Sequence, residues 1–203
     1  AGINNTAIGA GANSVNTTGN NNTANGFNAL TTNTTGNNNT AIGTNSLKSN
    51  TTGYSNIAIG MSSLFSNTTR SNLVAVGDSS LYNNGVGATL SFHATANTAI
   101  GSKALFTNSI GYYNAALGYH SLYSNTTGFA NTANGNEALF SNITGTNNTA
   151  NGNYSLKYNT SGSLNTANGS SALQSNTTGN FNTANGYQAL FYNTTGNYNT
   201  ANG

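Results

Sequence analysis

Few side chains in this sequence could carry out catalysis or hold a metal ion. The only carboxylates are Asp78 and Glu137, and the only histidines are His93 and His120. General acid–base catalysis needs titratable groups that meet at one substrate, and a zinc site needs at least three protein ligands. The two carboxylates are far apart in the sequence, and neither histidine has further ligands grouped around it. We therefore expect no enzyme active site, no metal site and no cofactor.

The composition narrows the possible partners. Only 3% of the 203 residues are charged, against roughly 25% in ordinary soluble domains. A net charge of +2 provides no basic patch, so nucleic acid is not an expected partner. No apolar run approaches the ~20 residues that a membrane-spanning helix requires, so no membrane insertion is expected in this segment.

The residues that do recur follow a period of 17. The unit is N-T-A-(I/N)-G-x-x-(A/S)-L-x-x-N-T-T-G-x-x, and its third and fifth positions are Ala and Gly in every copy from Ala7 to Gly203. One step, from Leu73 to Asn97, is 24 residues long, which places a seven-residue insertion near 86–96. A fixed short period indicates identical units that stack on one another. We expect residues 1–203 to form a single array with uncapped ends, as a segment of a longer fibre.

Seventeen residues suit one coil of a parallel β-solenoid (β-roll), so the predicted fold is all-β with about eleven coils. Each coil should hold two short strands, N-T-A-I-G and x-(A/S)-L-x, joined by N-T-T-G turns. We expect Arg70, which replaces the turn glycine in one unit, to cause local strain or a different turn. The ninth position is the expected core column, formed by Leu30, Leu47, Leu64, Leu81, Leu105, Leu122, Leu139, Leu156, Leu173 and Leu190.

The twelfth position supplies a column of asparagines. Stacked amides form hydrogen-bonded ladders along the axis of cross-β structures, although Asn is also a common turn residue. Many of these residues also begin an Asn-x-Thr sequon, so glycosylation is an alternative role. The column comprises Asn16, Asn33, Asn50, Asn67, Asn84, Asn108, Asn125, Asn142, Asn159, Asn176 and Asn193.

Two rows of large apolar residues are candidate interfaces. The fourth-position row should point out of the coil, where an apolar stripe usually marks an interaction site; the alternative is that this position points inward. The tenth-position row is aromatic, and it forms either a second interface or an exposed ladder of stacked rings. The first row contains Ile42, Ile59, Val76, Ile100 and Leu117, and the second contains Phe65, Tyr82, Phe106, Tyr123 and Phe140.

The segments N-T-A-I-G, N-I-A-I-G (56–60) and L-V-A-V-G (73–77) resemble the head repeats of trimeric autotransporter adhesins, the YadA-like heads. Similar Asn- and Gly-rich repeats occur in bacterial surface proteins and phage tail fibres. The resemblance implies a left-handed parallel β-roll that associates as a trimer outside the cell. The 17-residue period departs from the period of about 14 in YadA-like heads, with the extra length in N-T-T-G.

These observations favour a structural component of an extracellular filament or surface adhesin, including a phage virion fibre, whose partners are copies of itself in a trimer or filament. One alternative is an adhesin head that binds host glycans or surface receptors through its aromatic row. A second is an ice-binding solenoid, because the second position forms a row of hydroxyls. That row contains Thr6, Thr23, Thr40, Thr98, Thr132, Thr149, Thr166, Thr183 and Thr200.

Overall fold

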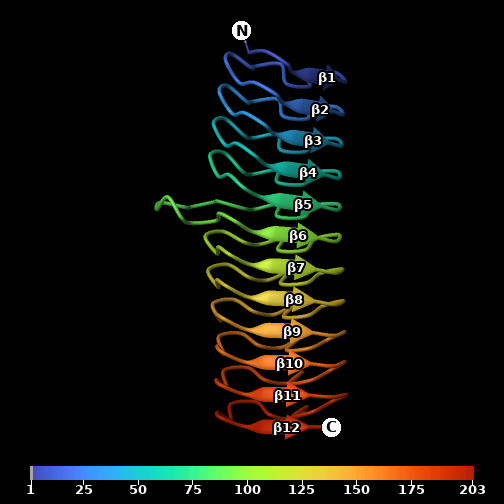
Figure 1. Ribbon diagram of the computed structural model, residues 1–203, viewed down its shortest axis with the longest axis vertical. Coiled ribbons are helices and arrows are strands. Elements are labelled where there is room, and N and C mark those ends of the chain that lie inside the picture. The colour runs from blue at the N-terminus through green and yellow to red at the C-terminus, as the bar shows by residue number, and fades with distance from the viewer. Residues whose placement is uncertain (1) are drawn as a thin grey trace.

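The computed structural model describes residues 2–203 as a rod of stacked coils (Figure 1). Each coil contributes one three-residue strand, and the described residues contain no helix. The predicted all-β parallel solenoid is therefore confirmed, with twelve turns. The strands are β1 (Thr6–Ile8), β2 (Thr23–Asn25), β3 (Thr40–Ile42), β4 (Ile57–Ile59), β5 (Val74–Val76), β6 (Thr98–Ile100), β7 (Ala115–Leu117), β8 (Thr132–Asn134), β9 (Thr149–Asn151), β10 (Thr166–Asn168), β11 (Thr183–Asn185) and β12 (Thr200–Asn202).

The strands form one parallel sheet in which each strand pairs with the next one in the sequence. Equivalent residues lie opposite one another, so Ala7 pairs with Ala24 and Thr166 with Thr183. The insertion between β5 and β6 leaves the side of the rod as a loop (Figure 1), and the pairing of Ala75 with Ala99 is preserved across it. Identical side chains are therefore stacked in columns along the rod axis.

The core is narrow and contains one large aliphatic column. The third-position alanines line one wall and are fully or almost fully buried in β2–β11. The leucine column fills the space opposite them: its members from Leu30 to Leu173 are completely buried, and Leu190 is partly buried. Burying a leucine side chain stabilises the fold by about 1.5–3 kcal/mol, so one leucine per coil, packed against a small alanine, provides a core in a thin coil.

The predicted second strand, x-(A/S)-L-x, is wrong: this segment is a series of turns. Successive strand residues face opposite sides, yet the eighth and ninth positions, such as Ala29 and Leu30, are both fully buried. The backbone brings both side chains inward by adopting a left-handed conformation at the ninth position, with φ of 53° at Leu30. Coil-to-coil hydrogen bonds continue through these turns; the Leu30 amide donates to the Ser46 carbonyl at 3.0 Å.

The invariant fifth-position glycine is required by both conformation and space. Gly152 has φ of +140°, and a Cβ atom there would lie 2.5 Å from the carbonyl oxygen of Gly169 in the next coil. Only glycine accommodates both conditions. The coils consequently approach one another closely at the end of each strand.

Candidate interaction surfaces

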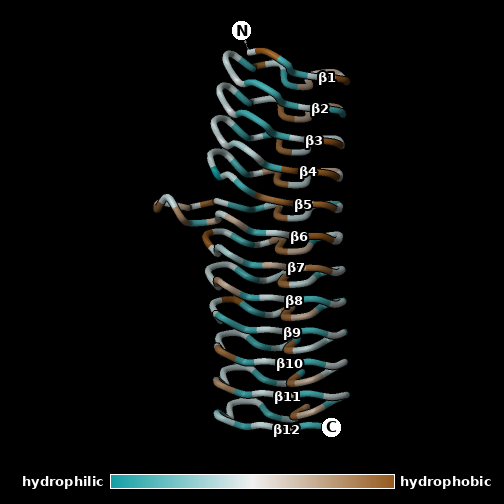
Figure 2. Tube along the Cα trace, viewed as in Figure 1, coloured by the Kyte–Doolittle hydropathy of each residue, from teal (hydrophilic) through white to brown (hydrophobic). Residues whose placement is uncertain are grey.

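The outward face of the strands carries an apolar patch on β3–β7. The second and fourth positions flank the buried alanine and point away from it, so the fourth-position row faces solvent and the inward alternative is wrong. Exposed fractions are 38% for Ile42, 37% for Ile59, 39% for Ile100 and 48% for Leu117. Figure 2 shows the strand column as brown at β3–β6 and teal at β8–β12. We define the apolar patch as Ile42, Ile57, Ile59, Val74, Val76, Ile100 and Leu117.

The patch includes a shallow hollow at β7. Ala115 occupies the second position of its coil, between Thr98 and Thr132 of the neighbouring coils. Because alanine replaces threonine there, this coil lacks the hydroxyl and methyl groups that its neighbours carry. The hollow is bordered by Ile100 and Leu117 on the neighbouring column. The apolar surface therefore has relief into which a side chain of another molecule could insert.

On β8–β12 the same face is polar. We call this region the Thr/Asn segment: it consists of Thr132, Asn134, Thr149, Asn151, Thr166, Asn168, Thr183, Asn185, Thr200 and Asn202. Its asparagines are joined along the axis from Asn151 to Asn202: Nδ2 of Asn151 donates to Oδ1 of Asn168 at 2.9 Å, and Asn168 donates to Asn185 at 2.9 Å. The outward face thus changes from aliphatic to amide and hydroxyl chemistry at β8.

The tenth-position aromatic row is a continuous stack of rings. The ring centroids of Phe65 and Tyr82 are 4.9 Å apart, those of Tyr82 and Phe106 5.2 Å, and those of Phe106, Tyr123 and Phe140 5.3 Å at each step. The rings are half-buried and nearly parallel, so each covers the faces of its neighbours. Lys48 Nζ lies 5.5 Å from the centroid of Phe65, at the end of the stack. The stack exposes ring edges, whereas stacking on a sugar requires a free ring face.

The twelfth-position asparagines form the ladder that their spacing suggested. In the central coils, Nδ2 of Asn142 donates to Oδ1 of Asn125 at 2.8 Å and to the carbonyl of Gly145 at 3.0 Å. Asn159 Nδ2 in turn donates to Asn142 Oδ1 at 2.8 Å. These amides are fully buried from Asn33 to Asn176. A glycan on such a nitrogen could not fit into the column, so the sequons at these positions serve as turn and ladder residues.

A second buried asparagine column, at the first position of the unit, was missed by the sequence reasoning. Asn148 Nδ2 donates to the Gly162 carbonyl at 2.8 Å, and Asn148 Oδ1 accepts the backbone N–H of Asn165 at 3.0 Å. The signal was present, because the first, third and fifth positions of a strand share a face. Leu73 replaces this asparagine in one coil and is completely buried there.

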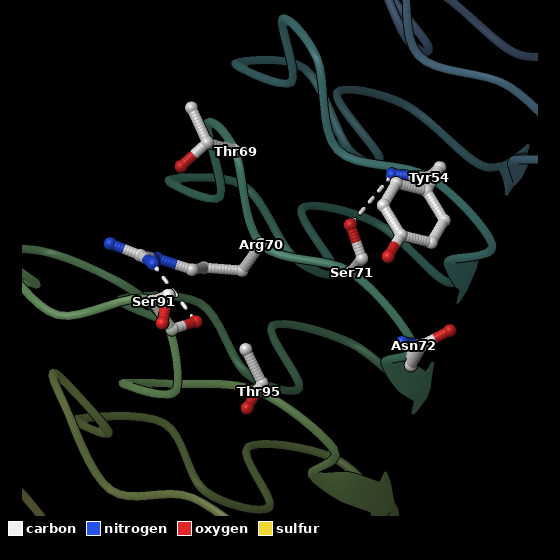
Figure 3. Close-up of a pocket in the computed structure, with 7 residues that line it drawn as sticks. All are labelled: Tyr54, Thr69, Arg70, Ser71, Asn72, Ser91 and Thr95. Carbon is white, nitrogen blue, oxygen red and sulfur yellow. Dashed lines mark hydrogen bonds between the residues drawn. The ribbon is translucent and has the colours of Figure 1, made fainter.

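Arg70 holds the insertion against the rod (Figure 3). Its Nη1 donates to the Leu90 carbonyl at 3.0 Å and its Nη2 to the Ala88 carbonyl at 2.9 Å. Figure 3 draws a third bond, from Nη1 to the Ser91 carbonyl at 3.4 Å. The expected strain at Arg70 is wrong: its φ is not positive, and its carbonyl accepts Asn67 Nδ2 at 3.0 Å as the turn glycines do. In most other coils the turn glycine that Arg70 replaces is buried, and a Cβ atom at Gly36 would lie 2.3 Å from the carbonyl oxygen of Gly53 in the next coil. Arg70 precedes the coil that carries the insertion, and its guanidinium donates to three carbonyls of the loop.

The titratable groups are used in local contacts. Lys157 Nζ pairs with Glu137 Oε2 at 2.8 Å, and this hydrogen bond raises the pKa of Lys157. Partial burial, and then the charge of Lys103, lowers the pKa of His120, whose ring stacks on Tyr119 at 3.8 Å. Asp78 accepts a hydrogen bond from Ser79 Oγ at 3.2 Å. Residues 2–203 contain no group of three or more His, Cys, Asp or Glu side chains placed to hold a metal ion.

Across the described part of the chain, no helix is long and apolar enough to cross a bilayer. Comparison with known proteins gives no matching family model, no similar curated protein and no similar solved structure.

Proposed function

We propose that this chain is a stiff segment of an extracellular filament or surface adhesin, and that copies of it associate through the apolar patch. The observation that carries the proposal is the unbroken aliphatic column from Ile42 to Leu117 on the outward face of five consecutive strands, whose members are exposed except for the partly buried Val76. Contiguous exposed apolar surface on a soluble protein marks an interaction site. The flat strand face allows a second copy to align its own column along the same length.

The aromatic stack contributes to this role differently from the patch. Because its rings already cover one another, the stack stiffens neighbouring coils within one chain, at about 0.5–1.5 kcal/mol for each aromatic pair. It therefore gives no specific support to a glycan-binding head. An extracellular site, at a cell surface or in a phage fibre, agrees with a rod that relies on uncharged side chains.

The test is self-association of the purified chain, measured by sedimentation velocity and negative-stain microscopy. We expect the wild-type protein to form trimers or filaments, and Ile59→Lys to shift it to monomers, because a charge would be buried in the contact. Asn168→Lys is the matched control, since it adds the same charge to the same face outside the patch. A wild-type chain that stays monomeric at high concentration, or equal effects of the two variants, would contradict the proposal.

A further inference from the structure

We propose that the Thr/Asn segment on β8–β12 is an ice-binding surface: it orders water in a lattice that matches ice and joins a growing crystal. This role is separate from the proposed self-association, because it uses a different stretch of the outward face.

The first support is the spacing of the polar groups. Neighbouring strands lie about 4.8 Å apart, and two residues along a strand span about 6.6 Å. Threonines are paired in register from Thr132 to Thr200, and asparagines from Asn134 to Asn202. The segment is therefore a two-dimensional array with one repeat along the axis and another across it. Oxygen atoms in hexagonal ice repeat at distances close to these two.

The second support is that the hydroxyls are unused. None of the five threonine hydroxyls of the segment makes a hydrogen bond to another residue of the described chain, while threonines elsewhere, such as Thr160 and Thr177, bond to backbone carbonyls of the next coil. A free hydroxyl offers one donor and two acceptor positions to water. Each threonine also presents a methyl group, so the row combines anchoring points for water with apolar surface between them.

The third support is rigidity. Hydrogen bonds of 2.9–3.0 Å join the side-chain amides from Asn151 through Asn202, and the alanines behind them are buried from β8 to β11. The strands point the same way along the whole rod (Figure 1), and an untwisted sheet of many strands persists where side-chain ladders support it. Water bound to such a face is held in fixed positions, so little ordering remains to be done when the crystal forms. This is the benefit that preorganisation gives to any binding site.

The fourth support is the absence of charge from this face. The six charged residues of the sequence all occupy unit positions other than the second and fourth, which are the outward positions of the strands. A charged group would hold a hydration shell oriented around itself, which differs from the tetrahedral order of ice. Water molecules on this face are therefore arranged by the regular array of hydroxyl and amide groups alone.

The experiment measures freezing hysteresis and incorporation of fluorescently labelled protein into a growing ice hemisphere. We expect the wild-type chain to show hysteresis and to enter the ice, and Thr166→Lys to lose most of both activities, because its ammonium group disturbs the centre of the array. Asn168→Lys, in the adjacent column, should give the same loss. Tyr192→Lys is the matched control, since Tyr192 is 86% exposed and lies outside the strands; it should retain wild-type activity.

Circular dichroism of every variant establishes that the fold is retained. A folded wild-type chain that shows no hysteresis and is excluded from ice would overturn the inference. So would a loss of activity in Tyr192→Lys equal to that in Thr166→Lys. Ile59→Lys separates the two proposals: it should abolish self-association and leave ice binding intact, and a failure of either proposal leaves the other readout unchanged.

Discussion

Asparagine is a regular interior residue of this rod, beside the buried alanines and leucines, although it is mostly exposed in globular proteins. One side-chain amide carries donors and acceptors together, so identical residues can bond to each other in a column without repulsion. In the twelfth-position ladder each central amide, such as that of Asn142, reaches the residue above, the residue below and a carbonyl of its own turn. The side-chain amides of this column are thereby satisfied by repetition.

Replacement of one buried asparagine should show how much the column contributes to the free energy of unfolding. Asn142→Ala leaves Asn125 Oδ1 and one N–H of Asn159 without their partner, and the Gly145 carbonyl keeps only the hydrogen bond from Asn131 Nδ2. Because an unpaired buried polar group costs about 1–3 kcal/mol, we expect the free energy of unfolding to fall by about 3 kcal/mol. Chemical denaturation followed by circular dichroism measures this change.

Asn153→Ala provides the comparison, since Asn153 is exposed and only accepts a bond from Asn136. Its effect should remain within about 0.5 kcal/mol, as for most surface substitutions. Equal effects of the two alanine variants would show that the buried ladder adds nothing beyond an ordinary surface amide.

Some of these columns could be predicted from the sequence and others could not, for a physical reason. The twelfth-position ladder and the inward alanine and leucine follow from strict recurrence, because repetition places like residues on top of each other. The first-position ladder, represented by Asn148, was recoverable from strand alternation and was missed. The turn around each leucine was not predictable from residue type, since leucine disfavours positive φ and adopts it only because burial of the side chain outweighs the strain.

Among the structural elements, the loop at 86–96 shows how a repeat accepts an insertion. Asn84 Nδ2 donates to the Ala94 carbonyl at 2.9 Å, which replaces the bond that other ladder asparagines make three residues ahead. The ladder therefore passes the insertion without interruption. The sequence located the insertion by its period, but Arg70, twenty residues upstream of Leu90, gave no signal that its side chain would reach the loop carbonyls.

Arg70→Gly would restore the repeat residue and remove the loop's attachment. We expect hydrogen exchange and proteolysis at 86–96 to increase, because the bonds to Ala88 and Leu90 are lost, while the melting temperature of the rod changes little. Mass spectrometry of exchanged peptides reports the loop and the strands β5 and β6 in one experiment.

Arg70→Lys serves as the control for charge, since a single ammonium cannot reproduce the forked contact of a guanidinium. It should give partial protection of the loop. Unchanged exchange in Arg70→Gly would mean that other contacts, such as Phe92 against Tyr112, are sufficient to hold the loop.

The molecule as a whole should respond weakly to pH and salt, because so few of its contacts are ionic. His120 is the exception near neutrality: its pKa is lowered from the ordinary value of 6.5 by burial and then by Lys103. The unfolded chain therefore binds this proton more readily than the folded chain does. Stability should be complete above the ordinary pKa and should decline as pH falls through it toward the lower folded value.

Melting curves between mild alkali and mild acid test this expectation. The wild-type melting temperature should show one small decrease in the acid direction, and His120→Gln should remove that decrease. Lys157 acts at the opposite end, since its pKa is raised by Glu137, and its contribution should disappear only in strong alkali. A wild-type curve that rises toward acid would contradict the sign of the His120 effect.

The direction of the backbone hydrogen bonds has a mechanical consequence. Since they join one coil to the next along the axis, a load applied to the two ends pulls directly on the interface between coils, and the coils should peel away singly. Each coil of 17 residues would release about 55 Å of extended chain, with a longer step where the 24-residue coil opens. A tether built in this way yields in equal increments and dissipates force before its attachment breaks.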